Sequence, residues 1–557
     1  MKIRIGIHSG AVTSGVLRGD KGRFQLFGDT INTASRMEST GQAGKIQVSP
    51  ETAALLKAQP TSKSKSFILE PREVKVFVKG KGHLQTYWLS KKDSNADAKS
   101  AASVSLSGSD ILTNIQKGDP FKTKTTRLVR WNTEEMTKLL KQVMATRLNR
   151  QQQQHPAAAT TIRSSTDDDD YMVLIPKTIP LEEVKDVVTL PVYDNNTEAA
   201  TEESTVSGTN SLVSTVMKRQ ASLSTTRTVI KPESIQLDDD VVTQLTDFVS
   251  QIASHYKKHP FHCFEHASHV SMAVTKLLKR IEQVSITKSK INGNTATFGI
   301  TSDPLLQLAA FFSAMIHDVD HQGIPNVSLA NEQPDMAQLY SNKSIAEQNS
   351  IDIAWDLLMR DEYAKLRKCM FGSSAGNTGS SNTKEELLHF RQLVVQMVMA
   401  TDVMDKELGL LRKERWQIAF DTNNTNRAVD DDIHNANRKA TIVLEHLIQA
   451  ADVSHTMQHW YIYIKWNERL FVEMYHAYKQ GRLDNDPSEN WYQSELGFLD
   501  YYIIPLAKKL ETCGVFGVSS DEFLIYATEN RKEWELKGKQ LVQDYVAKYN
   551  STYSVES

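Results

Sequence analysis

The sequence predicts a multidomain chain in which a large all-α domain follows a smaller domain of strands and helices, with a disordered linker between them. Three observations predict this organisation. From residue 232 onward, apolar residues recur at helical spacing and no convincing strand appears. KIRIGIHSG, near the start, alternates apolar with polar or small residues as a strand does. The stretch between carries Gln, Asp and Ser/Thr runs without apolar periodicity, which is typical of disorder.

These features divide the chain into four segments. We expect a partial domain over 1–92, a low-complexity linker over 93–231, a helical domain over 232–545 and a short tail over 546–557. A length of 557 residues alone would suggest about three or four domains. Because the linker lacks core-forming residues, two globular domains fit the composition better.

Composition and charge argue against several classes of protein. A net charge of −2 gives no reason to expect a nucleic-acid partner. The cysteines Cys263, Cys369 and Cys513 form no spaced pair and favour a reducing compartment. No apolar run reaches about 18 residues, and the start is not a signal peptide. We therefore expect a cytoplasmic protein, on the cytoplasmic side of a membrane if a longer parent protein exists, with no membrane span in this chain.

The first domain begins with a predicted strand in which Ile3, Ile5 and Ile7 share one face. FGDTINTASRMEST then indicates a glycine turn that leads into a helix. The pattern therefore predicts a domain that mixes strands and helices.

The linker carries one amphipathic helix, near 133–150. TEEMTKLLKQVMATRL places its apolar residues on one face, with Asn132 as the expected N-cap and Glu135 completing a capping box. We expect this helix to dock on one of the globular domains. The alternative is a free helix that binds a partner.

The all-α domain begins with a helix at DDDVVTQLTDFVSQIASHYKK, where Asp238 to Asp240 favour the N-terminus. Further apolar-periodic helices are predicted at 305–316, 343–370, 384–403, 437–453, 460–480 and 491–512. Loops rich in Gly, Ser and Asn, at 372–382 and 422–428, are expected to separate some of them.

Five of the sixteen histidines lie between residues 260 and 326. His262 and His266 lie four residues apart in PFHCFEHASHV, so they would share one face of a helix. SAMIHDVDHQGIPN adds His317, Asp318, Asp320 and His321. Imidazoles and carboxylates are usual donors for a divalent cation, and one carboxylate can bridge two cations in a hydrolytic site.

Burial makes this signal more specific. LLQLAAFFSAMI has the composition of a buried helix and delivers His317 and Asp318 at its C-terminal end. LEHLIQAADVSH does the same for Asp452. Charged groups carried by apolar helices need partners, and a shared cation supplies one. The pattern therefore predicts a metal site.

Residues 232–545 resemble the catalytic domain of class I 3′,5′-cyclic nucleotide phosphodiesterases, which are all-helical HD hydrolases. HCFEH at 262–266 matches the family's HN-x-x-H motif, and HDVDHQGIPN at 317–326 matches HD-x-x-H-x-G-x-x-N. Asp452 matches the last metal aspartate of the family, in A-D-[LIV]-S. The resemblance implies an HD-hydrolase fold and metal-dependent hydrolysis of cyclic nucleotides.

The resemblance also implies a role for each matched residue. The tighter ion, zinc by analogy, would be held by His266, His317, Asp318 and Asp452. Asp318 and water molecules would hold a second ion, magnesium or manganese. His262 would be the general acid for the departing 3′ oxygen, with His321 and Glu347 behind it. The ions would activate a water for in-line attack on phosphorus, and the product would be a nucleoside 5′-monophosphate.

Nucleotide preference depends on a second pair of residues. In this family a Gln hydrogen-bonds the purine edge and a Phe three residues later stacks on the base; SELGFLDYYIIPL places Glu495 and Phe498 there. An ionised Glu only accepts hydrogen bonds, which suits the N1–H and amino donors of guanine. We therefore expect cyclic GMP to be favoured over cyclic AMP. The alternative is that Glu495 pairs with a nearby Lys or Arg and never contacts the base.

Other departures from the family pattern lie near the predicted site. Cys263 stands where the family usually has Asn, which affects the expected orientation of His262. Asn349 and Ser350 occupy positions that are often His-His, and Lys406 replaces a His that often ends ATDM-x-x-H. None of these positions is a metal ligand in the resemblance.

Residues 1–92 are similar to the C-terminal half of a class III adenylate or guanylate cyclase domain, which has a ferredoxin-like α+β fold. The helix after FGDT carries Asn32 and Arg36, which in that family contact ribose and stabilise the transition state. A late lysine, Lys79 or Lys81, would meet the triphosphate, and Gln25 occupies the purine-reading position. The family's two metal aspartates belong to the preceding half-domain, so we expect a remnant without autonomous cyclase activity.

Two classes of function follow from these observations. The leading one is a metal-dependent cyclic nucleotide phosphodiesterase in cyclic nucleotide signalling, with a cyclic nucleotide as substrate and a possible homodimer through the cyclase remnant or the linker helix. The alternatives are a catalytically weak cyclic nucleotide sensor, and a cyclase half-site that a partner chain completes. Turnover by the purified protein with zinc and magnesium separates the first two, and conversion of a nucleoside triphosphate only on mixing would reveal the third.

Overall fold

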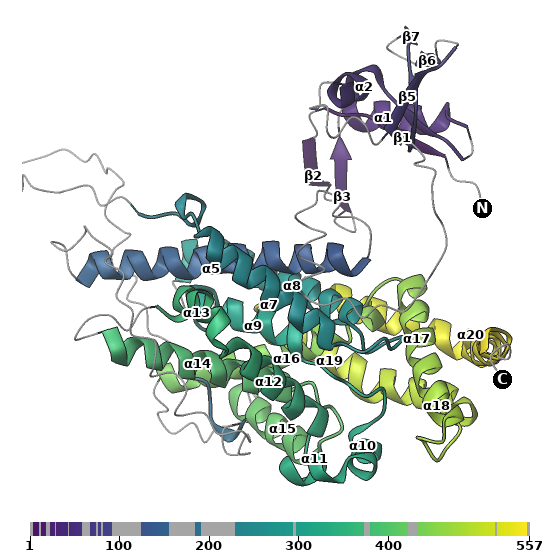
Figure 1. Cartoon of the computed structure of the whole chain (residues 1–557). Helices are drawn as coiled ribbons and strands as arrows, with labels where there is room; N and C mark the ends of the chain where they lie inside the picture. The colour runs from purple at the N-terminus through teal and green to yellow at the C-terminus, as the bar shows by residue number, and fades with distance from the viewer. Residues whose placement is uncertain are drawn as a thin grey trace, which may run out of the picture. The chain divides into compact units, whose positions relative to one another are not determined.

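The chain folds into two compact units, Met1–Val104 and Ser105–Ser557 (Figure 1). The first mixes strands and helices and the second is helical, which confirms the two predicted fold classes. The computed structural model describes residues 4–10, 13–17, 23–27, 29–42, 44–57, 67–73, 76–78, 82–91, 124–154, 184–190, 229–292, 297–372, 379–420, 432–517 and 521–553. Most of the predicted linker lies outside these ranges, as does Ile3 of the predicted strand.

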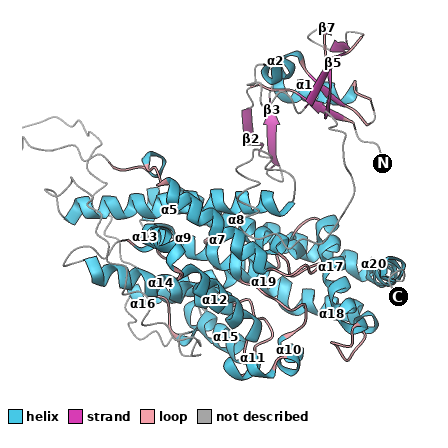
Figure 2. Cartoon of the chain, in the orientation of Figure 1, coloured by secondary structure: helices cyan, strands magenta, loops and turns pink. Residues whose placement is uncertain are grey.

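All strands of the described chain belong to the first unit (Figure 2). Its four-stranded sheet has the order β1 (Ile5–Ile7), β4 (Ile46–Val48), β8 (Tyr87–Lys91) and β5 (Phe67–Pro71). β1 and β4 are parallel, and the other two pairs are antiparallel. Two hairpins join β2 (Thr13–Leu17) to β3 (Arg23–Phe27) and β6 (Val76–Val78) to β7 (Gly82–Leu84), and the helices are α1 (Asp29–Ser39) and α2 (Pro50–Lys57).

Gly6 lets α1 lie directly against β1. A Cβ atom on this glycine would stand 2.0 Å from the backbone nitrogen of Glu38 and 2.5 Å from the carbonyl oxygen of Ala34. Both obstacles are backbone atoms of α1, so they cannot move aside as a side chain can. The helix predicted after FGDT is therefore held at backbone contact distance from the predicted strand.

We predict that Gly6→Ala destabilises the α1–β1 contact by about 1–3 kcal/mol, because the helix must shift to admit the methyl group. Hydrogen exchange at β1 and α1 measures this local opening. Gly409→Ala is the contrast, since a Cβ at this position meets nothing within 4 Å and replaces a helical glycine; it should stabilise by up to about 1 kcal/mol. Unchanged protection of β1 and α1 in Gly6→Ala would contradict the packing argument.

The described part of the second unit is built from α-helices (Figure 2). No helix among the described residues is long and apolar enough to cross a membrane. The helices are α5 (Lys124–Gln154), α7 (Asp239–His255), α8 (Phe264–Asn292), α9 (Pro304–Ile316), α10 (Asn326–Glu332), α11 (Pro334–Leu339), α12 (Ile345–Leu358), α13 (Ala364–Phe371), α14 (Gly379–Met399), α15 (Lys406–Phe420), α16 (Asp432–Asp452), α17 (Trp460–Lys479), α18 (Pro487–Phe498), α19 (Ile504–Thr512) and α20 (Asp521–Tyr553).

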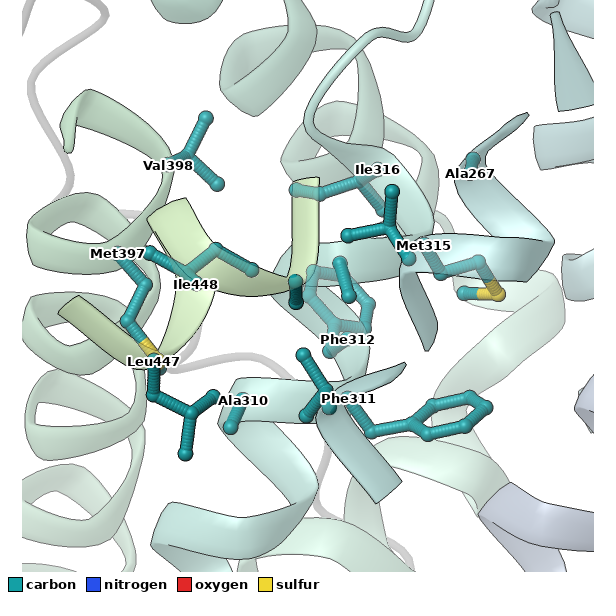
Figure 3. Packing of buried hydrophobic residues seen from close by; sticks show 14 of the residues in the cluster. Ala267, Ala310, Phe311, Phe312, Met315, Ile316, Met397, Val398, Leu447 and Ile448 are labelled. Atoms are coloured by element: carbon teal, nitrogen blue, oxygen red, sulfur yellow. The ribbon is translucent and has the colours of Figure 1, made fainter. Parts of the chain in front are cut away.

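Helix α9 is the centre of the hydrophobic core. Every residue from Leu308 to Ile316 is at most 1% exposed, so the helix is apolar on all sides, as its composition predicted. Figure 3 shows Phe311, Phe312, Met315 and Ile316 of α9 among residues of α8, α14 and α16. Asp303 caps the helix by accepting a hydrogen bond from the backbone N–H of Leu305. This buried scaffold fixes the position of the residues that follow Ile316.

Two predicted helices are interrupted in the structure. The segment 343–370 divides into α12 and α13, with the short η5 (Asp361–Tyr363) between them, because the chain turns at Arg360, which is in an extended conformation. The segment 491–512 contains a π-helical turn, η7 (Leu499–Ile503), directly after Phe498. Apolar spacing continues through both breaks, so periodicity alone does not reveal them. The final helix, α20, continues to Tyr553, into the segment expected to be a tail.

The amphipathic helix predicted near 133–150 lies within α5, which packs against α7, α8 and α9. The N-cap prediction for Asn132 is wrong, because the helix begins eight residues earlier at Lys124. Asn132 is fully buried inside the helix, where its amide donates to Leu128 O and to Ser268 Oγ of α8. Asparagine occurs both at helix N-caps and at buried positions where its amide donates into the core. Only tertiary contacts distinguish the two roles.

Candidate metal centre

Three helices bring the predicted ligands together. His266 lies in the first turn of α8, His317 and Asp318 follow the last residue of α9, and Asp452 is the last residue of α16. These helices contact one another pairwise in the core. The polar residues are therefore positioned by apolar helices whose own packing leaves them little freedom.

The donor atoms of these residues lie within a few ångströms of one another. His266 Nε2 lies 2.9 Å from Asp452 Oδ1 and 3.7 Å from Asp318 Oδ2. His317 Nε2 lies 3.2 Å from Asp318 Oδ2 and 3.4 Å from Asp452 Oδ1. Both histidines are 2% exposed. Two imidazoles and two carboxylates thus surround one point in the protein interior.

These residues fit a divalent cation. Ligands at about 2.0–2.1 Å from a tetrahedral ion stand about 3.3 Å apart, which is close to the observed separations. His317 Nε2 and Asp318 Oδ2 are buried without a hydrogen-bond partner among the described residues, which costs free energy unless something binds them. His317 Nδ1 lies 3.0 Å from Ala314 O and donates to it, so the Nε2 lone pair faces the carboxylates.

The charges at this point also favour a cation. Burial alone would lower the pKa of His317, but the carboxylates of Asp318 and Asp452 raise it well above its ordinary value. Burial alone would raise the pKa of each aspartate, but His317 lowers that of Asp318, and His266 and His317 lower that of Asp452. The carboxylates therefore stay ionised, and a bound cation would replace the proton on His317.

Asp318 also belongs to a second group. Ligand atoms of His262, Asp318 and His321 lie within 4.8 Å of one another. The rings of His262 and His321 are stacked, with centroids 3.7 Å apart. Burial, followed by the neighbouring charge of His262, lowers the pKa of His321 to about 3, so this ring is neutral. Its Nδ1 accepts the backbone N–H of Gly323, which leaves the proton on Nε2.

Glu473 of α17 orients His262, and no motif in the sequence indicates this role. Its carboxylate accepts the backbone N–H groups of Phe261 and His262 at 2.7 and 3.0 Å, and it accepts the His262 Nδ1–H. Burial would lower the pKa of His262, but Glu473 raises it to about 9. Burial would raise the pKa of Glu473, but His262 lowers it to about 2. His262 is therefore protonated near neutral pH, and this carboxylate rather than Cys263 orients its ring.

Glu347 lies beside Asp402 behind the metal centre. Burial, and then the Asp402 carboxylate, raise the pKa of Glu347 to about 8. Asn326 donates to both carboxylates, and Ser344 donates to Asp402 at 2.8 Å. Asp402 lies three residues after the end of α14, so, like Asp318 and Asp452, it is an acid near the C-terminal end of an apolar helix. That signal could have identified it.

The backbone conformation explains the glycine of the HD-x-x-H-x-G motif. Gly323 has φ +70°, a conformation that favours glycine, and the His259 ring lies 3.0 Å from where its Cβ would be. Asp320 of the same motif points elsewhere, to Lys257 at 3.3 Å. The turn therefore separates the two aspartates of HDVDH, and only Asp318 faces the histidines.

Glu495 and Phe498 lie one helical turn apart on α18. Glu495 is 9% exposed and accepts a hydrogen bond from the Tyr463 hydroxyl at 2.7 Å; no lysine or arginine of the described chain is within ion-pair distance. Phe498 is partly exposed and stacks on Tyr502, with ring centroids 5.3 Å apart. Burial, and then the charge of Asp452, raise the pKa of Tyr502, which places this aromatic pair near the metal centre. No hydrogen bond joins Glu495 or Phe498 to the four predicted ligands within the described residues.

The structure gives less information on the predicted cyclase residues. Arg36 is exposed in the last turn of α1, and Asn32 lies in the same helix. Gln25 lies on β3. Lys79 and Lys81 are outside the described residues. The roles that the resemblance gives to these residues stay predictions.

Two family models match separate parts of the chain. Residues 261–515 match 3'5'-cyclic nucleotide phosphodiesterase, and residues 1–91 match the adenylate and guanylate cyclase catalytic domain. The first match contains the predicted metal ligands, His262, Glu473 and the α18 pair. The second contains the strands and helices of the first unit.

Curated relatives repeat this division. A probable 3',5'-cyclic-AMP phosphodiesterase of Caenorhabditis elegans, pde-4, is 26% identical over 298 residues, which cover 52% of this chain and 39% of that protein. The mouse 3',5'-cyclic-AMP phosphodiesterase 4C is 28% identical over 235 residues, covering 41% of this chain and 31% of that protein. The receptor-type guanylate cyclase gcy-13 of C. elegans is 49% identical over 89 residues, covering 16% of this chain and 8% of that protein.

The chain thus spans less than half the length of each of these relatives. Among solved structures, the phosphodiesterase domain of Salpingoeca rosetta rhodopsin phosphodiesterase is similar at 18% identity, with a TM-score of 0.39, covering 56% of this chain and 84% of that one. By the family-model matches, residues 261–515 are similar to the 3',5'-cyclic nucleotide phosphodiesterases, and residues 1–91 are similar to the adenylate and guanylate cyclase catalytic domains.

Proposed function

We propose that this chain hydrolyses the 3′ phosphoester bond of 3′,5′-cyclic nucleotides and releases nucleoside 5′-monophosphates. The observation that carries the proposal is the meeting of His266, His317, Asp318 and Asp452 at one buried point beside His262. Two divalent cations, zinc at the four-ligand point and magnesium or manganese shared through Asp318, would supply an activated water and offset charge on the phosphoryl oxygens.

The protein residues would position the substrate and move one proton. His262 holds a proton through Glu473, and its ring lies beside Asp318, so it would donate to the 3′ oxygen as the P–O bond breaks. His321, neutral and stacked on His262, would donate from Nε2 to a phosphoryl oxygen or to a water. Glu347, with its raised pKa, would accept or donate a proton in the same hydrogen-bond network through Asn326.

The proposal is tested by turnover of cyclic AMP and cyclic GMP by the purified chain with zinc and magnesium. We expect hydrolysis to cease after chelation and to return when the ions are restored. The control substrate is a linear phosphodiester. Contaminating metal-dependent nucleases would hydrolyse it under the same conditions. Binding of a cyclic nucleotide without turnover would contradict the proposal and favour the sensor alternative.

We further propose that Glu495 determines the purine specificity. Guanine would be favoured when the Glu495 carboxylate is ionised. The curated phosphodiesterase relatives named above are cyclic-AMP phosphodiesterases, so they give no support for this preference. Its support is local: Glu495 is buried, lies beside the partly exposed Phe498 and has no cationic partner in the described chain. Tyr463 and Asn467 donate to this carboxylate, and its remaining acceptor sites would accept from guanine.

This arrangement predicts a pH-dependent preference. Burial raises the pKa of Glu495 to about 7, against hydrogen bonds from Tyr463 and Asn467 that lower it. Above that pH the carboxylate accepts from guanine, and below it the protonated acid can donate to adenine N1. The ratio of kcat/KM for cyclic GMP over cyclic AMP should therefore rise as the pH increases through about 7. A contact of ~1–3 kcal/mol corresponds to a change of roughly 5- to 150-fold. Glu495→Gln should abolish the pH dependence, and an equal ratio at every pH in both proteins would contradict this assignment.

The homodimer expected through the linker helix loses its basis, because α5 places its apolar face against α7, α8 and α9 of the same chain. A dimer through the cyclase region stays a proposal. Analytical ultracentrifugation of the full chain tests it: a dimer that persists when α5 is unchanged and dissociates when exposed residues of the first unit, such as Leu55, become charged would support it.

A further inference from the structure

A second cavity lies beside the candidate metal centre, and its lining includes His266 and Asp452 but neither Glu495 nor Phe498. It has a volume of about 690 Å³ and is enclosed by α8, η6 (Ser454–Met457), α17 and the first turns of α20. We call it the α8–α17 cavity. Its volume falls within the roughly 300–1,000 Å³ of small-molecule sites.

The residues that line this cavity differ from those of the predicted purine site. Tyr463 and Asn467 are four residues apart and point toward α18, where they contact Glu495 and Trp491. Ile462, Lys465 and Trp466 line the cavity. None of Tyr463, Asn467, Glu495 and Phe498 is among the residues that line the cavity. A ligand in this cavity would therefore not occupy the purine site.

The walls of the cavity suit an organic anion. Its apolar lining includes Val270, Leu277 and Phe523, and two lysines, Lys276 of α8 and Lys465 of α17, stand at its edge. No carboxylate of the described chain lies within ion-pair distance of either lysine. The two acids of the lining are committed elsewhere: Glu522 pairs with Arg280, and Asp452 pairs with His266 and His317. A ligand would therefore meet two positive charges at the edge of the cavity and apolar side chains inside it.

Trp466 connects the cavity to the catalytic residues. Its indole contacts the rings of His269, His266 and Phe261, with centroids 5.2, 5.6 and 5.7 Å apart. His266 is a predicted metal ligand, and Phe261 precedes His262 and donates its backbone N–H to Glu473. A ligand that displaces the indole would move the side chains that hold the metal ligand and the general acid.

We propose that the α8–α17 cavity binds an organic anion with an apolar ring body, and that its occupancy changes turnover through Trp466. Binding is independent of the proposed function, whereas the effect on turnover rests on it. The ligand chemistry follows from the two lysines and the apolar floor, and the coupling follows from the ring contacts of Trp466. His269, which lies outside the phosphodiesterase motif, acquires a role here as a polar group on the cavity wall.

Anilinonaphthalene sulfonate, an aromatic sulfonate with a fluorescence readout, is the probe for this test with the full chain. We expect saturable binding that weakens about tenfold or more in the double variant Lys276→Glu/Lys465→Glu, because two near-surface attractions become repulsions. Ala273→Trp, which fills the cavity from α8, should weaken binding by a similar factor. Lys508→Glu, an exposed lysine on α19, is the control and should bind as the unmodified chain does.

Two results would overturn the proposal. One is unchanged affinity in the lysine double variant, which folds regardless of the cavity because both side chains are exposed. The other is displacement of the probe by saturating cyclic nucleotide, which would place the probe in the purine site. In a parallel turnover assay, saturating probe should change kcat at least about twofold in the unmodified chain and not in the double variant. Absence of any turnover in the unmodified chain would count against the proposed function and leave the binding result standing.

Discussion

Asp318→Asn is expected to lower kcat/KM for cyclic nucleotides by about a thousandfold or more, because a bridging carboxylate supports several kcal/mol of transition-state stabilisation and each 1.4 kcal/mol is tenfold. Asp318 lies close to His266 and His317 and also groups with His262 and His321, so its loss would affect both sets of possible ligands. The amide keeps the shape of the side chain but removes the charge that attracts the cations. Zinc and magnesium content, measured on the same preparation, should fall together with turnover.

The matched control is Asp320→Asn, two positions along the same motif. Asp320 pairs with Lys257 on the outside of the turn, so we expect activity within about tenfold of the unmodified protein and full metal content. Circular dichroism should show the same helical content in both variants. Turnover of Asp318→Asn within tenfold of the unmodified chain, with metals retained, would show that this carboxylate is not a bridging ligand.

Glu473→Gln is expected to lower kcat about a hundredfold at neutral pH, because a positioned general acid contributes roughly 10²–10⁴-fold. Glu473 counteracts the burial of His262 and holds its pKa at about 9. The folded-state pKa is raised, so the proton is present at lower pH and is lost as the pH increases through that value. Without the carboxylate, burial lowers the pKa, and the imidazole loses its proton before neutral pH is reached.

The measurement for this prediction is the pH profile of kcat. In the unmodified chain, activity should fall on the alkaline side, and cations bound nearby would bring that limb below pH 9. In Glu473→Gln the limb should move to lower pH by at least about two units, while KM changes little. Glu468→Gln, on an outer face of the same helix, pairs with Lys548 and should leave the profile unchanged. An unshifted limb in Glu473→Gln would remove Glu473 from the mechanism.

The sequence was sufficient for the part of the site that apolar helices deliver. Leu308 to Ile316 are buried on every side, so the polar residues that follow them had to be either neutralised or bound. The same reasoning applied to Asp452, and the structure brings it within 2.9 Å of His266 across 186 positions of the chain. Motif spacing alone would not have joined these residues. Their assignment as ligands stays a prediction until a metal is measured.

Residues that act from the side of an amphipathic helix were not predictable. Glu473 lies on α17 among Phe471, Met474 and Tyr475, and nothing in that spacing distinguishes an inward carboxylate from a solvated one. Only the tertiary contact with the 261–262 backbone shows its role. The N-cap prediction for Asn132 was wrong for a related reason. Asparagine serves both as an N-cap and as a buried donor, and here its amide donates to Ser268.

The central claim is that four side chains from three helices hold a cation, and anomalous X-ray diffraction at the zinc edge tests it most directly. The predicted result is a peak about 2.0–2.2 Å from His266 Nε2, His317 Nε2 and carboxylate oxygens of Asp318 and Asp452. A weaker second site should share Asp318. Crystals grown with zinc and magnesium that diffract well but show no peak among these four residues, or show zinc only elsewhere, would contradict the account.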